Sequence, residues 1–144
     1  MKYFKQRTGY TCGVACARMV LHAAGKKTSR DKLIKMLKPT KETGTQNNAF
    51  PRVAEKLKLN YVVSRNSSWK DLRSVFNSGF VIIVCYWLDN EKTGHYAVIK
   101  SLNKNGVVLM DPWYGPLHKV SKSWFLKNWH GTQEKRWFFG IKSS

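Results

Sequence analysis

With 144 residues and 42% hydrophobic side chains, the chain is long enough to bury a core, and we expect residues 1–144 to form a single domain. No apolar run approaches the roughly 20 residues of a membrane-spanning helix, and the N-terminus lacks the basic-then-apolar order of a secretory signal peptide. Three cysteines are an odd and low number for a small secreted domain, so the sequence favours the cytoplasm or another reducing compartment.

The charge of the chain is strongly unbalanced, with 26 Lys and Arg residues against 8 Asp and Glu, a formal net charge of +18. Seven of the basic residues fall in the first thirty positions, which contain no Asp or Glu, and the remainder are dispersed. The surface is either simply cationic and solvated, or it attracts an acidic partner such as nucleic acid, an anionic membrane or an acidic substrate. The charge by itself indicates non-specific attraction and no particular function.

The first half of the chain is predicted to be mainly helical. Apolar residues from Val14 onward repeat with helical spacing, and Gly25 ends the pattern. Residues 28–29 are suitable N-caps for a second helix, and Ser68 with Asp71 resembles a capping box for a later one. The first helix is expected to begin at about Cys12 and to stop at Gly25. Further helices are expected at residues 30–37, 47–59 and 68–76, and a short strand at residues 61–63.

The second half of the chain has the composition of a β-sheet. Residues 80–87 form a β-branched and aromatic run that is typical of a central strand. Residues 103–106, Asn-Lys-Asn-Gly, are a strong hairpin turn, and residues 111–116 are a turn cluster. Further strands are expected at residues 95–100, 107–111 and 136–141, with a helix at residues 121–129. Helices first and an antiparallel sheet afterwards make this an α+β domain.

Cys12 is predicted to lie at or just inside the N-terminus of the first helix. There the unpaired backbone N–H groups and the positive end of the helix dipole favour an anion. A thiol in that position loses its proton more readily, and the thiolate is the nucleophile. Gln6 lies six residues upstream, so its amide N–H can face an oxyanion that forms beside the sulfur.

His95 and Asp111 are predicted to lie at the same end of a hairpin. His95 begins its strand directly after Gly94, and Asp111 ends the partner strand directly before Pro112. A neighbouring carboxylate fixes the tautomer of a catalytic imidazole and stabilises the imidazolium. Together with Cys12, these residues are the components needed for acyl transfer through a thioester.

Three motifs in this order resemble those of the C39-type cysteine peptidases of the papain-like superfamily: Gln6-x5-Cys12-Gly13, Gly94-His95-Tyr96 and Asp111-Pro112. The resemblance extends to about residue 130 and includes Gly44-Thr45, Gly79 and Phe125-x3-Trp129. It implies a papain-like cysteine peptidase fold, with N-terminal helices packed on a C-terminal antiparallel sheet. It also implies roles for four residues.

In that resemblance Cys12 is the nucleophile and His95 is the general base. Asp111 orients His95, and the side chain of Gln6 forms the oxyanion hole with the backbone N–H of Cys12. Family members fused to peptide exporters cut leader peptides after a double glycine and usually have an acidic residue before the cysteine, where this chain has Thr11. The sequence also lacks membrane spans and an ATPase motif, so we expect a stand-alone domain and do not expect double-glycine cleavage by default.

The leading interpretation is a cysteine peptidase, or a related amidase or isopeptidase, that acts on a peptide or protein through a Cys-His-Asp triad and a thioester acyl-enzyme. The alternative is a catalytically idle papain-fold protein that binds nucleic acid or another polyanion through its cationic surface. The two interpretations are compatible, since a basic peptidase can be co-localised with nucleic acid. A toxin-like effector that acts on a host protein is a third interpretation, which the sequence does not separate from the first.

The remaining cysteines, histidines and tryptophans are assigned structural roles. Cys16 and Cys85 are expected to be small buried hydrophobic residues, because a Cys-x3-Cys pair without further ligands is weak evidence for zinc. No cofactor or metal is expected. The histidines without a matching partner are expected to be structural or solvated, namely His22, His118 and His130. Several aromatic residues are expected mostly in the core, with one or two lining the substrate cleft, namely Trp113, Tyr114, Trp124 and Trp129.

Overall fold

The computed structural model describes residues 1–143, which contain five helices and six strands. The helices are α1 (Cys12–Ala23), α2 (Arg30–Leu37), α3 (Ala49–Lys56), α4 (Trp69–Asn77) and α5 (Lys122–Asn128). The strands are β1 (Asn60–Ser64), β2 (Val81–Leu88), β3 (Thr93–Asn103), β4 (Gly106–Asp111), β5 (Gly115–Ser121) and β6 (Phe138–Lys142). They form one antiparallel sheet in the order β1-β6-β2-β3-β4-β5. The predicted α+β class, with N-terminal helices packed on an antiparallel sheet, is confirmed.

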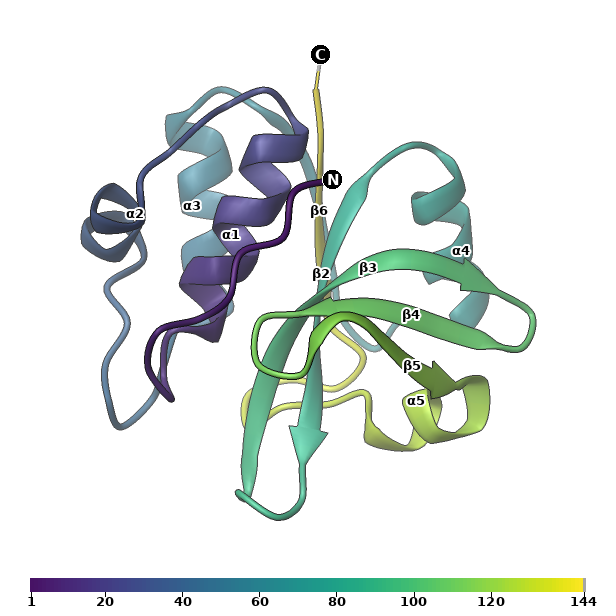
Figure 1. Ribbon diagram of the computed structural model, residues 1–144. Coiled ribbons are helices and arrows are strands. Elements are labelled where there is room, and N and C mark those ends of the chain that lie inside the picture. Colours follow the sequence, from purple (N-terminus) through teal and green to yellow (C-terminus); the bar gives the residue numbers. More distant parts are fainter. Residues whose placement is uncertain (144) are drawn as a thin grey trace.

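Helices cover both faces of the sheet. Figure 1 shows α1, α2 and α3 together on one side, with α4 and α5 on the other. Strand β2 serves both sides: Ile83 and Cys85 belong to the core beneath α1 to α3, whereas Ile82, Val84 and Tyr86 belong to the core beneath α4 and α5. Burial on both faces explains why this strand is a continuous apolar run rather than an alternating one.

Two predicted helix caps are present. The hydroxyl of Ser29 accepts a hydrogen bond from the backbone N–H of Lys32 and so caps α2. Ser68 and Asp71 form a reciprocal capping box at the start of α4. Within residues 1–143, no helix combines the length and the apolar composition needed to cross a membrane.

The third helix and the last sheet edge differ from the sequence predictions. The helix expected over residues 47–59 is shorter and spans Ala49–Lys56, because Lys58 adopts a left-handed φ of 56° just after its end. Strand β5 was not predicted, and its first residues were interpreted as part of a turn. As an edge strand, β5 pairs with β4 only and tolerates Pro116. Its residues are exposed or half-buried, so the strand lacks the apolar pattern that would have predicted it.

Candidate active site

Cys12 is the first residue of α1 and is buried, with 7% of its surface exposed. Thr11 stands at the N-cap, but its hydroxyl accepts from the backbone N–H of Thr8 at 3.1 Å and caps no N–H of the helix. The first turn also contains no acidic side chain. The sulfur therefore lies where the dipole of α1 is not offset by a side-chain acceptor or a carboxylate from its own helix.

Gly13 allows one wall of the site to lie close to this helix tip. A Cβ at this position would lie 2.6 Å from Oγ1 and 2.7 Å from Cβ of Thr45, so no larger residue fits without displacing that wall. Tyr96 fixes the same segment from β3, donating from its hydroxyl to the backbone carbonyl of Thr45 at 2.8 Å. The residue after His95 thus anchors the loop that faces Cys12.

His95 and Asp111 are in direct contact, as the hairpin predicted. Val98 of β3 lies opposite Met110 of β4, and this register brings Nε2 of His95 to 2.7 Å from Oδ1 of Asp111. Both side chains are buried. The contact fixes the orientation of the imidazole and directs its other nitrogen away from the carboxylate.

Every oxygen of the Asp111 side chain has a partner. Oδ1 accepts from the backbone N–H groups of Trp113 and Tyr114 at 2.9 and 3.0 Å, in addition to His95. Oδ2 accepts from the hydroxyl of Tyr86 at 2.5 Å. A buried carboxylate with this number of donors is held in the charged form and in one orientation.

The electrostatics of the pair favour a protonated imidazole. Burial lowers the pKa of His95, but hydrogen bonds to Asp111 and to the thiol of Cys12, together with the negative charges of both groups, outweigh burial and raise it from 6.5 to about 10. Burial raises the pKa of Asp111, and the hydrogen bond and charge of His95 outweigh this effect and lower it below its usual value. The site therefore stabilises an imidazolium between a carboxylate and a sulfur.

A cleft of about 440 Å³ opens in front of these groups. Gln6, Cys12 and His95 all line it, and Asp111 lies behind His95. The backbone N–H of Gln6 donates to the carbonyl of Pro112 at 3.0 Å, which ties the N-terminal segment to the end of β4. Its Nε2 donates to the carbonyl of Thr8 at 2.7 Å, and this leaves the second hydrogen of the amide for another acceptor.

The sequence analysis missed Tyr86 as a partner of Asp111. The residue lies inside a continuous apolar strand, where an aromatic side chain gives no sign of a polar role. Pairing of β2 with β3 places Tyr86 directly opposite His95, and the ring centroids of the two residues are 5.3 Å apart. Only the register of that pair, which the sequence does not specify, identifies the tyrosine.

The expectation that the aromatic residues near the site belong mostly to the core is wrong for three of them. Trp113, Tyr114 and Trp124 are 49%, 45% and 38% exposed, whereas Trp129 is buried. Trp113 and Tyr114 lie in the predicted turn between β4 and the unpredicted edge strand β5, and Trp124 lies on the short helix α5 that follows that strand. Trp113 lines the cleft, as expected for at least one of the set.

Cys16 and Cys85 are both buried and unpaired, as predicted. Burial, followed by the charge of Cys12, raises the pKa of each thiol. In the part of the chain that the structure describes, no group of three or more His, Cys, Asp or Glu residues is arranged to hold a metal ion. Of the three cysteines, only Cys12 lines the cleft in front of His95.

The sequence matches the peptidase C39 family over residues 1–133. The chain belongs to this family. It is therefore a cysteine peptidase, and the family resemblance carried by the three motifs is confirmed.

This C39 peptidase is 30% identical over 132 residues to the lactococcin-A transport/processing ATP-binding protein LcnC of Lactococcus lactis subsp. lactis. The match covers 90% of the chain but only 18% of LcnC. Among solved structures, the peptidase domain of Streptococcus ComA, a bi-functional ABC transporter involved in quorum sensing, is similar with a TM-score of 0.80 at 21% identity, over 99% of this chain and 98% of that one.

A double glycine motif protease from an AMS/PCAT transporter, solved with its leader peptide, is similar with a TM-score of 0.76 at 18% identity. That match covers 99% of this chain and 91% of the protease. At these identities the structural likeness shows that the fold is shared. The predicted papain-like peptidase fold is confirmed.

Proposed function

We propose that this C39 peptidase hydrolyses a peptide bond with Cys12 as nucleophile, His95 as general base and acid, and Asp111 as the group that positions His95. The observation that carries the proposal is the imidazole of His95, which bonds Asp111 at 2.7 Å and lines the same open cleft as Cys12. A buried carboxylate, an oriented imidazole and a thiol at a helix tip are the groups that thiol hydrolysis requires.

The reaction runs in two steps. The proton of Cys12 moves to His95, the thiolate attacks the substrate carbonyl, and the backbone N–H of Cys12 with Nε2 of Gln6 stabilises the oxyanion. His95 then gives the proton to the leaving amine, the C–N bond breaks, and a thioester to Cys12 remains. A water molecule, deprotonated by His95, attacks the thioester, and the carboxylic acid leaves as the thiol of Cys12 is restored.

The substrate class that we place first is a peptide with a double-glycine motif. Support comes from two similar proteins, a transport/processing protein and a double glycine motif protease bound to a leader peptide. Thr11 stands where transporter-fused members usually have an acidic residue, so the preference requires a direct test. Matched peptides with Gly-Gly, Ala-Ala or Gly-Ala before the scissile bond decide it, with cleavage located by mass spectrometry.

The mechanism is tested by intact-mass analysis after treatment with a peptidyl electrophile. We expect one adduct per chain, located on Cys12, because Cys12 lines the cleft, whereas Cys16 and Cys85 do not and their pKa values are raised. Cys12→Ala should abolish the adduct and turnover, and Cys85→Ala should retain both. Modification of Cys16 or Cys85 in place of Cys12 would contradict the assignment.

The polyanion-binding alternative stays a prediction based on the net charge of +18 alone. Its signature is salt-dependent retention on nucleic acid that Cys12→Ala leaves unchanged, in a protein that the electrophile does not label. The family match gives it no support, since that match concerns a peptidase.

A further inference from the structure

Two smaller cavities continue from the catalytic cleft along the N-terminal segment. The first, of about 20 Å³, shares Gln6 with the cleft, and the second, of about 270 Å³, shares Phe4 and Arg18 with the first. Each cavity therefore borders the next across shared side chains, and together they lie along α1 from Thr11 to His22. We name the two cavities beyond Gln6 the basic channel, after the cationic residues that line it: Lys2, Lys5, Arg7, Arg18, Lys27 and Arg30.

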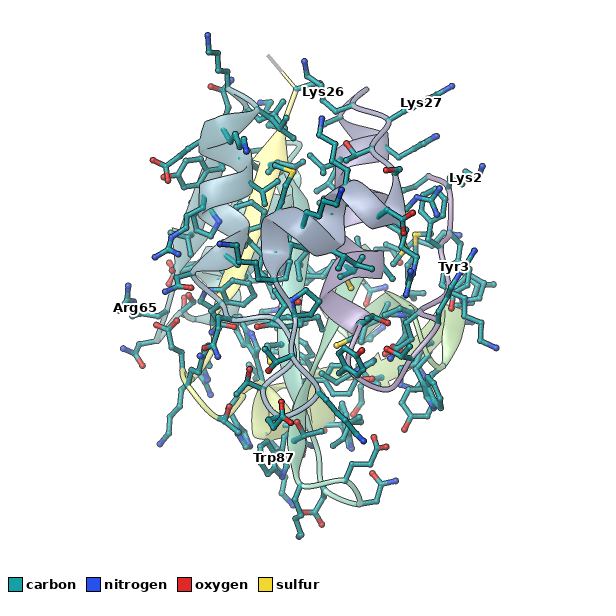
Figure 2. The ribbon with its side chains drawn as sticks, turned by 90° about the vertical axis from the view of Figure 1, so that its left-hand side faces the viewer. Lys2, Tyr3, Lys26, Lys27, Arg65 and Trp87 are labelled. Carbon is teal, nitrogen blue, oxygen red and sulfur yellow. The ribbon has the colours of Figure 1, made fainter. Side chains whose placement is uncertain are left out.

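The basic channel collects almost all of the positive charge that the sequence places in its first thirty residues. Six of those seven Lys and Arg residues line it, and no Asp or Glu does. Among residues 1–143, Arg30 alone of the six has an ion-pair partner, and that partner, Asp31, is 3.8 Å away with 89% of its side chain exposed. Figure 2 shows Lys2 and Lys27 on the same side of the molecule, projecting outward, with Arg65 on the opposite side.

Arg18 offers an unused donor at the junction of the two cavities. Its guanidinium lies 4.0 Å from the centre of the Phe4 ring, and its Nε is buried without a hydrogen-bond partner. A buried N–H without an acceptor is destabilising, so an oxygen atom supplied by a ligand would satisfy it. The cation–π contact holds the guanidinium in place, which reduces the entropy that a ligand must remove.

We propose that the basic channel binds an acidic segment of the peptide substrate, so that Asp or Glu residues flanking the scissile bond select it. The proposal rests on the proposed function, because the bound peptide reaches the channel past Gln6 in the catalytic cleft. An acidic peptide fits better than single-stranded nucleic acid, which binds through exposed aromatic rings that stack on bases. Phe4 is occupied by Arg18 at 4.0 Å and Lys2 at 5.3 Å, and contacts the ring of His22 at 5.9 Å.

The test measures binding without turnover, using the chain with Cys12→Ala and fluorescein-labelled peptides. The peptides share a central Gly-Gly and carry a run of glutamates, or of glutamines of equal length, on either the N-terminal or the C-terminal side. The channel variant is Lys2→Gln/Lys5→Gln/Lys27→Gln, which changes exposed side chains only. The matched control is Lys56→Gln/Arg73→Gln/Lys104→Gln, which removes the same charge at exposed positions outside every described cavity.

We expect the glutamate peptide to bind about tenfold more tightly than the glutamine peptide in one of the two placements, since several exposed charge pairs add modest increments. The channel variant should erase this difference, and the control variant should retain it. Equal binding of both peptides in both placements overturns the proposal, as does an equal loss in the two variants. Tighter binding of an oligo-dT, lost in the channel variant only, also overturns it, because the channel would then serve nucleic acid.

The same peptides separate this proposal from the proposed function. If the chain with Cys12 intact cleaves none of them while the glutamate preference is present in binding, the peptidase assignment to these substrates fails and the channel stands. If cleavage proceeds with equal kcat/KM for glutamate and glutamine peptides, the peptidase assignment stands and the channel fails.

Discussion

Asp111 combines more contacts than any other residue of the site. Its carboxylate accepts from His95, Tyr86 and two backbone N–H groups, and its own backbone carbonyl accepts from the hydroxyl of Tyr3 at 2.5 Å. The side chain is wholly buried. In the proposed mechanism this residue positions the imidazole and takes no part in proton transfer, because its lowered pKa keeps the carboxylate ionised.

Asp111→Asn should therefore lower kcat by roughly 10³–10⁴-fold, because an amide presents the imidazole with the wrong hydrogen-bond pattern and stabilises the wrong tautomer. Steady-state kinetics on a cleaved peptide measure the effect, and a thermal melt checks that the fold is kept. Asp89→Asn is the matched control, since Asp89 is exposed and pairs only with Lys92 at 3.0 Å. A residual activity near that of the control would assign Asp111 a purely structural role.

His95 makes the stability of the protein depend on pH. Its pKa is raised from 6.5 to about 10, so the folded chain keeps a proton that the unfolded chain loses above pH 6.5. The stabilisation is complete below pH 6.5 and is lost as pH rises toward about 10. Between pH 7 and 9 the wild-type chain should lose about 1.4 kcal/mol per pH unit relative to His95→Gln.

Urea denaturation of both chains across this range measures the difference in the free energy of unfolding. Titrations of groups outside the site cancel in the difference, because they are common to both chains. A difference that stays constant from pH 7 to 9 would mean that His95 is neutral in the folded protein.

At the scale of elements, the loop between α2 and α3 forms a wall of the cleft that β3 and the segment before β6 hold in place. Tyr96 donates to the carbonyl of Thr45 and lies 2.5 Å from Oδ1 of Asn47. Nδ2 of Asn47 donates to Glu134 at 3.2 Å, and Glu134 pairs with Arg65 at 3.1 Å. The wall is thus fixed by polar contacts among four segments that are distant in sequence.

Tyr96→Phe should raise KM for peptides, because the hydroxyl holds the wall of the cleft through Thr45 and Asn47. The rate of acylation by a small electrophile should be nearly unchanged, because these hydrogen bonds do not involve Cys12 or His95. The cost in unfolding free energy should be about 1–3 kcal/mol, since a buried acceptor loses the one hydrogen that the hydroxyl donates. Peptide kinetics and iodoacetamide labelling rates, measured on the same preparations, separate the two effects. An equal fall in both rates would instead give the hydroxyl a role in positioning His95.

The sequence predicted most elements, and the contact between the candidate residues His95 and Asp111, because the signals are local. Ser29, Ser68 and Asp71 mark helix starts, and Asn103 to Gly106 mark the hairpin that brings His95 to Asp111. The contact of Tyr86 with Asp111 was not predicted, because it depends on the register of β2 against β3. The position of Thr45 against Gly13 and the edge strand β5 were not predicted either, because both depend on tertiary packing. Those features are set by tertiary packing, which overrides local preference.

At the scale of the whole molecule, the sheet joins two cores that share no helix. Met19 of α1 is buried in one core, and Leu72 of α4 is buried in the other. Strand β2 contributes alternate side chains to both cores, so loss of packing on one face disturbs the strand on which the other face packs. This coupling supports the prediction that residues 1–144 are a single domain.

The prediction is tested by weakening each core separately. Met19→Ala and Leu72→Ala should each lower the free energy of unfolding by about 2–5 kcal/mol, because both side chains are fully buried. If the two cores unfold together, each substitution lowers the midpoint of the same transition, and tryptophan fluorescence and far-UV circular dichroism trace one curve. A variant in which one probe shifts and the other stays would show that the two faces of the sheet unfold independently, and the chain would then contain two cooperative units.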